Sequence, residues 1–207
     1  MAVIVPTVLA ATPQEYQQNL GRVSFAKRLH IDITDGEFAP NRTINLAQAY
    51  WPQGKQVDLH LMVKEPKRCL ELCISMSPSL VIVHAEVGHQ SEMLAELKRV
   101  GIKTGVAFLQ QTDPSRQDLS GFDHGLVFTG SLGYYGGQLH RGSLSKIATI
   151  KQLKSDIEVG VDGGINDTNI ADVVKAGADV LNVGGFLQQA DSAKKAYDKL
   201  VKLVQEG

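Results

Sequence analysis

Several features that mark common protein classes are scarce or missing in this sequence. Its 207 residues carry a formal net charge of -1 at pH 7, with no basic cluster and no acidic tail. Because affinity for a phosphate backbone comes from clustered Lys and Arg, a nucleic-acid partner is not expected. No apolar run approaches the roughly 20 residues of a transmembrane helix, so a membrane-embedded protein is not expected either.

Cysteine is also scarce, because the chain contains only Cys69 and Cys73. A metal site or a disulfide is one interpretation of this pair. The favoured interpretation is that both thiols act as small apolar side chains on one helical face, in a reducing compartment. The apolar segment 1–6 has neither the basic leader nor the apolar length of a signal peptide. We therefore expect a protein of the cytoplasm.

No segment of the chain has the composition of a linker. Runs rich in Gly, Ser or Pro are missing, and the hydrophobic share of 43% and charged share of 21% are those of a globular protein. A chain of this length buries enough surface to fold without a disulfide or a metal staple. Residues 1–207 are therefore expected to form a single domain.

The sequence does contain a regular alternation of short apolar runs and longer amphipathic segments. About eight runs rich in β-branched residues recur on the order of 25 residues apart, which is the length of one βα unit. These predicted strands are Val3–Leu9, Arg28–Ile33, Val57–Val63, Leu80–His84, Lys103–Phe108, His124–Thr129, Ile157–Val161 and Val180–Val183. The predicted helices between them include Glu65–Ser75, Ser91–Val100, Ser143–Lys154, Asn169–Ala176 and Ser192–Val204, while Thr43–Tyr50 gives two turns at most.

Near-continuous apolar strands separated by helices indicate a parallel sheet that is covered on its faces. Eight such units without a linker favour closure of the sheet over an open, doubly wound arrangement. The fold predicted from the pattern is therefore α/β, a single (β/α)8 TIM barrel over residues 1–207.

Titratable residues interrupt the apolar pattern where three of the predicted strands end. Alternation places His30 and Asp32 on one face of the second strand, and His60 and Asp162 occupy similar positions on the third and seventh. Taken alone, each could be a hydrogen-bonded histidine or a turn-forming aspartate. Burying two carboxylates together without a cation is costly, so we predict that the four converge as ligands of one divalent ion, Zn, Fe, Mn or Co.

The other histidines carry weaker signals. His84 closes the fourth predicted strand, and it is equally compatible with a contact to the site and with a structural role. His89, His124 and His140 have no comparable context, so we interpret them as structural or surface residues.

Glycine pairs follow the last three predicted strands, as Gly136-Gly137, Gly163-Gly164 and Gly184-Gly185. Glycine allows backbone N–H groups to approach an anion closely, and phosphate sites formed after strands 7 and 8 recur in barrels of this kind. Any single pair could serve only a turn. Three pairs in succession predict a phosphate site, and hence a small phosphorylated ligand.

At these residues the sequence resembles the ribulose-phosphate 3-epimerase family. The family's second-strand signature is matched by His30, Asp32, Asp35, Gly36, Phe38, Pro40 and Asn41. Its other motifs resemble Pro6-Thr7-Val8-Leu9, Asp58-x-His60-Leu61-Met62, Gly136-Gly137-Gln138 and Val161-Asp162-Gly163-Gly164-Ile165. These matches span nearly the whole chain and occur in the family's order.

The resemblance implies a TIM barrel of the ribulose-phosphate-binding type and a metal-dependent isomerase. Its reaction would invert C3 of a ketose phosphate, D-ribulose 5-phosphate to D-xylulose 5-phosphate, through a metal-stabilised enediolate. Asp32 and Asp162 would move the protons on opposite faces of the substrate, and with His30 and His60 they would hold the ion. Substrate contacts are implied for Thr7, His60, Met62, Gly136, Gly137, Gly163, Gly164, Gly184 and Gly185. We also expect the chain to form a homo-oligomer.

The sequence departs from the family's pattern at the wall of the pocket. Thr34 and Thr129 stand where methionine is usual, and the phosphate loop contains Tyr134-Tyr135 in place of the usual Gly-Phe. Gly184-Gly185 replaces a Gly-Ser pair. Two alternatives therefore stay open: a C3 epimerase of another ketose phosphate, such as a hexulose 6-phosphate, and a non-catalytic barrel that binds a sugar phosphate.

Overall fold

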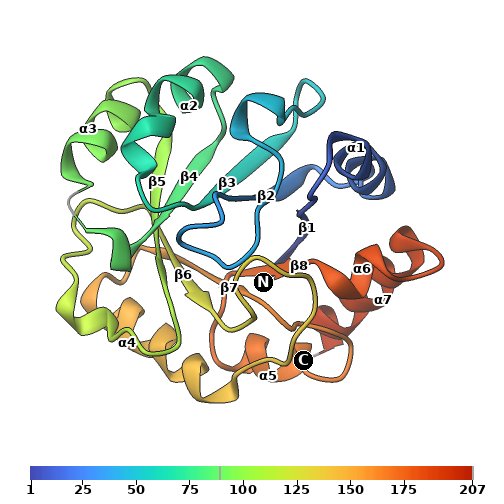
Figure 1. Cartoon of the computed structure of the whole chain (residues 1–207). Coiled ribbons are helices and arrows are strands. Elements are labelled where there is room, and N and C mark those ends of the chain that lie inside the picture. The colour runs from blue at the N-terminus through green and yellow to red at the C-terminus, as the bar shows by residue number, and fades with distance from the viewer. Residues whose placement is uncertain (89, 207) are drawn as a thin grey trace.

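Eight parallel strands close into a barrel in the order of the sequence (Figure 1), in a computed structural model that describes residues 1–88 and 90–206. The strands are β1 (Val3–Val8), β2 (Arg28–Thr34), β3 (Gln56–Met62), β4 (Leu80–His84), β5 (Lys103–Phe108), β6 (His124–Phe128), β7 (Glu158–Asp162) and β8 (Val180–Val183). The predicted fold class is confirmed, and no strand end differs from its predicted position by more than one residue.

Helices surround the strands on the outside of the barrel (Figure 1). They are α1 (Pro13–Arg22), α2 (Leu70–Met76), α3 (Ser91–Arg99), α4 (Ser145–Leu153), α5 (Ile170–Lys175), α6 (Gly185–Gln188) and α7 (Ala193–Glu206). Single 3-10 turns stand in the β2–β3 and β5–β6 connections, at Leu46–Gln48 and Pro114–Arg116. The segment Thr43–Tyr50, for which two helical turns at most were expected, thus contains one 3-10 turn. None of the helices in the described part of the chain combines the length and apolar character that crossing a bilayer requires.

The main core lies between the strands and the helices, and a smaller apolar layer fills the barrel itself. Leu80, Ile82, Ala107 and Leu126 form this inner layer. Glycine makes room for it, since a Cβ at Gly105 would lie 3.0 Å from Ile82 Cγ1. The middle of the barrel is therefore a packed plug, and ligands can reach only its ends.

Cys73 behaves as the predicted apolar filler. Its side chain is completely buried in the core, and Cys69 is partly buried against the same cluster. Burial raises the pKa of the Cys73 thiol to about 12, so this sulfur stays protonated and unreactive at neutral pH.

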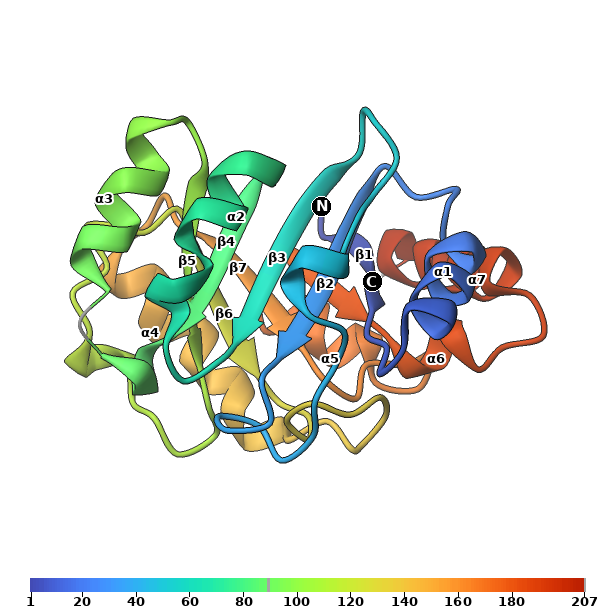
Figure 2. The same ribbon diagram turned by 45° about the horizontal axis from the view of Figure 1, so that its top comes forward.

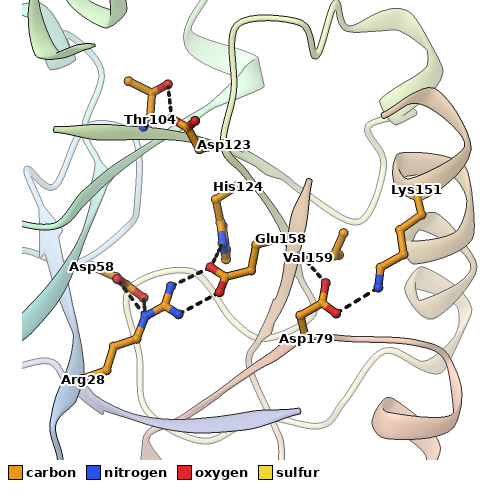
Figure 3. A network of polar contacts seen from close by, with 9 residues as sticks. All are labelled: Arg28, Asp58, Thr104, Asp123, His124, Lys151, Glu158, Val159 and Asp179. Atoms are coloured by element: carbon orange, nitrogen blue, oxygen red, sulfur yellow. Dashed lines mark hydrogen bonds and ion pairs between the residues drawn. The ribbon is translucent and has the colours of Figure 1, made fainter. Parts of the chain in front are cut away.

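The floor of the barrel, at the amino ends of the strands, is closed by a charged network (Figure 3). Arg28 Nε donates to Asp58 Oδ2 at 2.8 Å, and Arg28 Nη2 donates to Glu158 Oε2 at 2.7 Å. The same Glu158 oxygen lies 2.9 Å from His124 Nδ1, and the His124 side chain is buried. Because β2 and β7 are separated by two strands in the barrel, the Arg28–Glu158 pair spans its interior. His124, interpreted from the sequence as a structural or surface residue, is therefore a buried structural residue.

We expect Glu158→Gln to lower the free energy of unfolding by about 1–2 kcal/mol at neutral pH, since Glu158 is partly exposed and Arg28 keeps Asp58 as a partner. Burial opposes ionisation, but hydrogen bonds from Arg28 and His124 hold the pKa of Glu158 far below its ordinary value of 4.5. The stabilisation is thus present above pH 4.5 and lost as the pH falls toward the folded-state pKa.

Urea unfolding of the wild type and the variant at pH 7 and pH 4 checks this expectation. The difference in the free energy of unfolding between the two proteins should become smaller at pH 4, because protonation of Glu158 in the wild type begins to weaken its ion pair with Arg28. Glu71→Gln, at an exposed position on α2, is the control. Equal stabilities of wild type and Glu158→Gln at pH 7 would contradict the role assigned to the network.

Candidate active site

The four predicted metal ligands meet at the carboxyl ends of β2, β3 and β7. Strand β2 carries His30 and Asp32, the register pairs Asp32 with His60 on β3, and Asp162 is the last residue of β7. All four side chains are buried, and each offers one ligand atom within 4.8 Å of the others. The structure therefore brings together the four residues that the sequence analysis grouped, and their role as metal ligands stays a prediction.

Two nitrogens and two oxygens point to one place in this cluster. Asp32 Oδ1 lies 2.9 Å from His60 Nδ1 and 3.2 Å from His30 Nε2. Asp162 Oδ2 lies 3.9 Å from each of the same two nitrogens. Imidazole nitrogens and carboxylate oxygens in this number are a common donor set for Zn²⁺ and for other divalent first-row metals.

The two aspartates have opposite tendencies to ionise. Burial opposes the charge on both, but hydrogen bonds from His30 and His60 hold the pKa of Asp32 well below its usual range. Burial and the charge of Asp32 raise the pKa of Asp162 above its usual range. Two close carboxyl groups with separated pKa values are the arrangement that supplies a base and an acid at the same pH.

His84, whose role the sequence left open, contacts this cluster. Its Nε2 lies 2.9 Å from His60 Nε2, and its Nδ1 lies 3.2 Å from Glu86 Oε2. The rings of His60 and His84 are stacked, with centroids 5.0 Å apart. Glu86 is a neighbour that sequence reasoning missed, although it follows His84 by two residues at the end of β4. His89 lies outside the described residues, and His140 contacts Ser143 away from the cluster.

A small cavity of ≈ 30 Å³ opens above the aspartates at the mouth of the barrel. Besides Asp32 and Asp162, its lining includes the predicted substrate positions Thr7, Met62, Gly136, Gly163, Gly164, Gly184 and Gly185. His60 and Gly137 do not line it. The Thr7 hydroxyl is buried and has no hydrogen-bond partner among the described residues. No Lys or Arg belongs to this lining in the described part of the chain, so an anion bound here would be met mainly by backbone N–H groups.

The loop that follows β6 covers this cavity. Figure 2 shows it beside the loop that follows β2, below the strand arrowheads, and Asn41 Nδ2 donates to the Gly133 carbonyl where the two loops meet. The Tyr135 hydroxyl accepts a hydrogen bond from Leu9 N–H at 2.6 Å. Tyr134, in contrast, is 54% exposed. The loop after β6 thus contributes Gly133, Tyr134, Tyr135 and Gly136 to the wall of the cavity.

The two unusual threonines turn their hydroxyls toward the backbone. Thr34 Oγ1 donates to the Asn41 carbonyl at 2.8 Å, and Thr129 Oγ1 donates to the Asp162 carbonyl at 3.0 Å. Neither residue lines the mouth cavity. Both hydroxyls therefore hold the loops after β2 and β7, and they are not directed at a ligand.

The glycine pairs differ in what the backbone requires of them. Gly163 and Gly164 have φ values of +108° and +74°, and a Cβ on either would collide with neighbouring backbone. Their turn demands glycine whether or not an anion binds. Gly185 lies outside the left-handed region, and a Cβ there would come 3.0 Å from Gly136 N. Of these positions, Gly185 is the one that tests the phosphate site most directly.

Asn182 is a further residue that sequence reasoning did not find. It lies on β8 in register with Asp162, and its side chain is buried. Neither polar atom of its amide has a hydrogen-bond partner among the described residues. A polar residue inside the short apolar run Val180–Val183 was the only signal that the sequence offered.

The fold is a closed (β/α)8 barrel, and a buried His₂Asp₂ cluster lies at the carboxyl ends of its strands. Together these two features are typical of barrel enzymes. The model of the ribulose-phosphate 3 epimerase family matches residues 3–187. Similar curated proteins include the ribulose-phosphate 3-epimerases of Bacillus subtilis, 30% identical over 83% of this chain and 84% of that protein, and of Mycobacterium tuberculosis, 30% identical over 95% and 90%. The chain belongs to the ribulose-phosphate 3-epimerase family and is an enzyme of the isomerase class.

Solved structures support the fold alone. The 3-hexulose-6-phosphate synthase from Salmonella typhimurium aligns with a TM-score of 0.72 at 17% identity, covering 98% of both chains. A phosphoribosyl anthranilate isomerase from Thermus thermophilus aligns with a TM-score of 0.67 at 15% identity, covering 98% of this chain and 100% of that one.

Proposed function

We propose that this protein is a metal-dependent epimerase that inverts C3 of a ketose phosphate, with D-ribulose 5-phosphate and D-xylulose 5-phosphate as its substrate pair. The observation that carries the proposal is the buried cluster of His30, Asp32, His60 and Asp162 beneath the mouth cavity. The names of the curated relatives support the choice of a pentulose phosphate.

The cluster fits one divalent ion, Zn, Fe, Mn or Co. Its donors are two imidazole nitrogens and two carboxylate oxygens, all within 4.8 Å of one another and all buried. Two buried carboxylates so close together need a positive charge between them, and no soft thiolate restricts the choice of metal. When bound, such an ion supplies Lewis-acid stabilisation of the negative charge that develops on the substrate oxygens.

The protons are handled by Asp32 and Asp162. These two aspartates belong to β2 and β7, and both line the mouth cavity in which the reacting carbon would lie. One carboxylate removes the proton from C3, and the carboxyl group on the other face returns one with inversion. Before any ion is bound, the pKa of Asp32 is lowered and that of Asp162 is raised, so the two carboxyl groups already differ in their tendency to ionise.

The phosphate would lie against the loops that follow β6, β7 and β8. Glycines from all three loops line the cavity. Because the unusual Thr34 and Thr129 direct their hydroxyls to the backbone, they give no specific reason to prefer a hexulose phosphate. We further propose that residues 1–207 act as a single domain with a small phosphorylated sugar as ligand. Cytoplasmic location and a homo-oligomeric state stay predictions.

A panel of ketoses tests this assignment. We expect the highest kcat/KM for ribulose 5-phosphate, with solvent deuterium incorporated at C3, and far lower values for a hexulose 6-phosphate and for unphosphorylated ribulose. A clear preference for the hexulose 6-phosphate would move the assignment to the sibling activity. Binding of ketose phosphates without turnover of any of them, in metal-loaded protein, would leave the non-catalytic alternative.

A further inference from the structure

The two histidines of the cluster differ in how their outer nitrogens are held. His60 turns Nδ1 toward Asp32 and places Nε2 2.9 Å from His84 Nε2. His30 turns Nε2 toward the cluster, and its Nδ1 has no hydrogen-bond partner among the described residues. A second hydrogen bond therefore fixes the ring of His60 and leaves the ring of His30 unconstrained by any such contact.

The positions of the protons follow from the geometry once His60 Nδ1 serves as a ligand. A ligand nitrogen carries no proton, so the neutral ring of His60 is protonated at Nε2. At 2.9 Å this N–H donates to His84 Nε2, which must then be an acceptor. A neutral imidazole that accepts at Nε2 carries its proton on Nδ1, which faces Glu86 Oε2 at 3.2 Å. Each assignment determines the next, so a single arrangement of protons satisfies all the hydrogen bonds from His60 through His84 to Glu86.

The last member of this row of hydrogen bonds is the carboxylate of Glu86, which is itself held in place. Glu86 Oε1 accepts hydrogen bonds from Leu109 N–H, at 3.0 Å, and from the Thr112 hydroxyl, both in the connection after β5. Burial works against its charge, but hydrogen bonds from His84, Thr112 and Leu109 lower the pKa of Glu86 to about 2. Glu86 is therefore an anion at neutral pH and an acceptor for His84 Nδ1–H.

The ring of His84 has little freedom to leave this position. It stacks on His60 at an interplanar angle of 26°, and the Phe38 ring packs against it at 46°, with centroids 4.6 Å apart. Its exposed fraction is 1%. A locked imidazole between a ligand histidine and a carboxylate orients the ligand ring and increases its basicity.

We propose that His84 and Glu86 are positioning residues that set the tautomer and orientation of His60 and so strengthen metal binding at the cluster. The inference rests on the proposed function, because it assigns His60 Nδ1 as a metal ligand. It adds two residues, from the end of β4 and the segment after it, to the four that hold the ion.

The binding of Zn²⁺ to the full-length protein, measured by competition with a chromogenic chelator, tests the inference without reference to turnover. His84→Leu should weaken Zn²⁺ binding about 10- to 100-fold. His84→Gln offers an amide oxygen near the position of Nε2 and should restore most of the affinity. Glu86→Gln, at a partly exposed site where folding is less at risk, should weaken binding roughly 3- to 10-fold.

His124→Leu is the matched control, because it removes another buried histidine that contacts a carboxylate, on the floor of the barrel (Figure 3). Its Zn²⁺ affinity should equal that of the wild type. In addition, long-range ¹⁵N–¹H spectra of the Zn²⁺-loaded wild type should show His84 neutral, with its proton on Nδ1. A role in packing alone would not determine that tautomer.

The outcomes separate this inference from the proposed function. If His60→Ala weakens Zn²⁺ binding but His84→Leu and Glu86→Gln bind as the wild type does, the inference is wrong and the metal site stands. A proton on His84 Nε2 in the Zn²⁺-loaded protein would overturn it as well. If the wild type does not bind Zn²⁺ at all, both the inference and the proposed metal site fail.

Discussion

Replacing Asp32 or Asp162 with asparagine should lower epimerase turnover by about 10³- to 10⁴-fold, because each change removes a proton carrier together with an ion ligand. Asparagine has nearly the shape of aspartate, so the buried cavity is not overfilled. The measurement is kcat with ribulose 5-phosphate in metal-loaded protein, with bound metal determined on the same samples. Asp123→Asn is the control, since Asp123 accepts a hydrogen bond from Thr104 N–H and lies near the residues of the barrel floor (Figure 3).

Isotope exchange sharpens this experiment. In a variant that still holds the ion, the remaining aspartate can remove the C3 proton from one of the two epimers and return a deuteron from D₂O on the same face. Exchange without inversion, for one epimer in Asp32→Asn and for the other in Asp162→Asn, is the expected signature of two bases on opposite faces. Near-wild-type inversion in either variant, with unchanged incorporation of deuterium, would show that the two-base mechanism is wrong.

The strands and the four clustered side chains could be predicted from the sequence because both depend on local pattern. A barrel strand that is buried on both faces is a short apolar run, and a polar residue inside such a run stands out. Alternation then decides which face the residue occupies, so the sequence alone places His30 and Asp32 on one side of β2. Closure of the barrel needs only the number of units, which the spacing of the runs supplied.

Helix α1 was not predicted, although its first turn carries a recognisable signal. Thr12 accepts a hydrogen bond from Glu15 N–H, Glu15 Oε2 accepts one from Ala11 N–H, and Pro13 occupies the first turn. A threonine followed three residues later by a glutamate, with proline between them, indicates the start of a helix. The polar composition of Pro13–Arg22 concealed it, because only Tyr16 and Leu20 are buried.

The contacts that complete the site could not be predicted, because they join residues far apart in the chain. Tyr135 reaches Leu9, 126 residues away, and Glu86 reaches the backbone of Leu109, 23 residues away. No periodicity shows that Tyr135 turns inward while Tyr134 turns outward. The direction of a side chain on an irregular loop follows from what it packs against, and here that surface is the end of β1 and the glycine at position 184.

Gly185→Val is expected to raise KM for the phosphorylated sugar by about 10- to 100-fold and to lower kcat as well. Gly185 lines the mouth cavity at the start of α6, and a Cβ there would already come 3.0 Å from Gly136 N in the loop after β6. A valine would therefore occupy the space in which the backbone N–H groups of two loops can approach an anion. Because the phosphate helps to hold the reacting carbon between the aspartates, weaker binding should also slow the reaction.

The alternative is that the glycines after β6 and β8 serve only the close packing of their loops. Gly185→Val would then lower the melting temperature but leave KM of the folded fraction unchanged. Gly121→Val is the control for a glycine where a Cβ meets nothing within 4 Å, and it should alter neither KM nor kcat. Gly185→Ala, with a smaller side chain, should give an intermediate KM if the anion is crowded directly. Equal affinity of the wild type for ribulose and ribulose 5-phosphate would contradict the phosphate site, because the glycine-lined cavity would then contribute nothing to recognition of the charge.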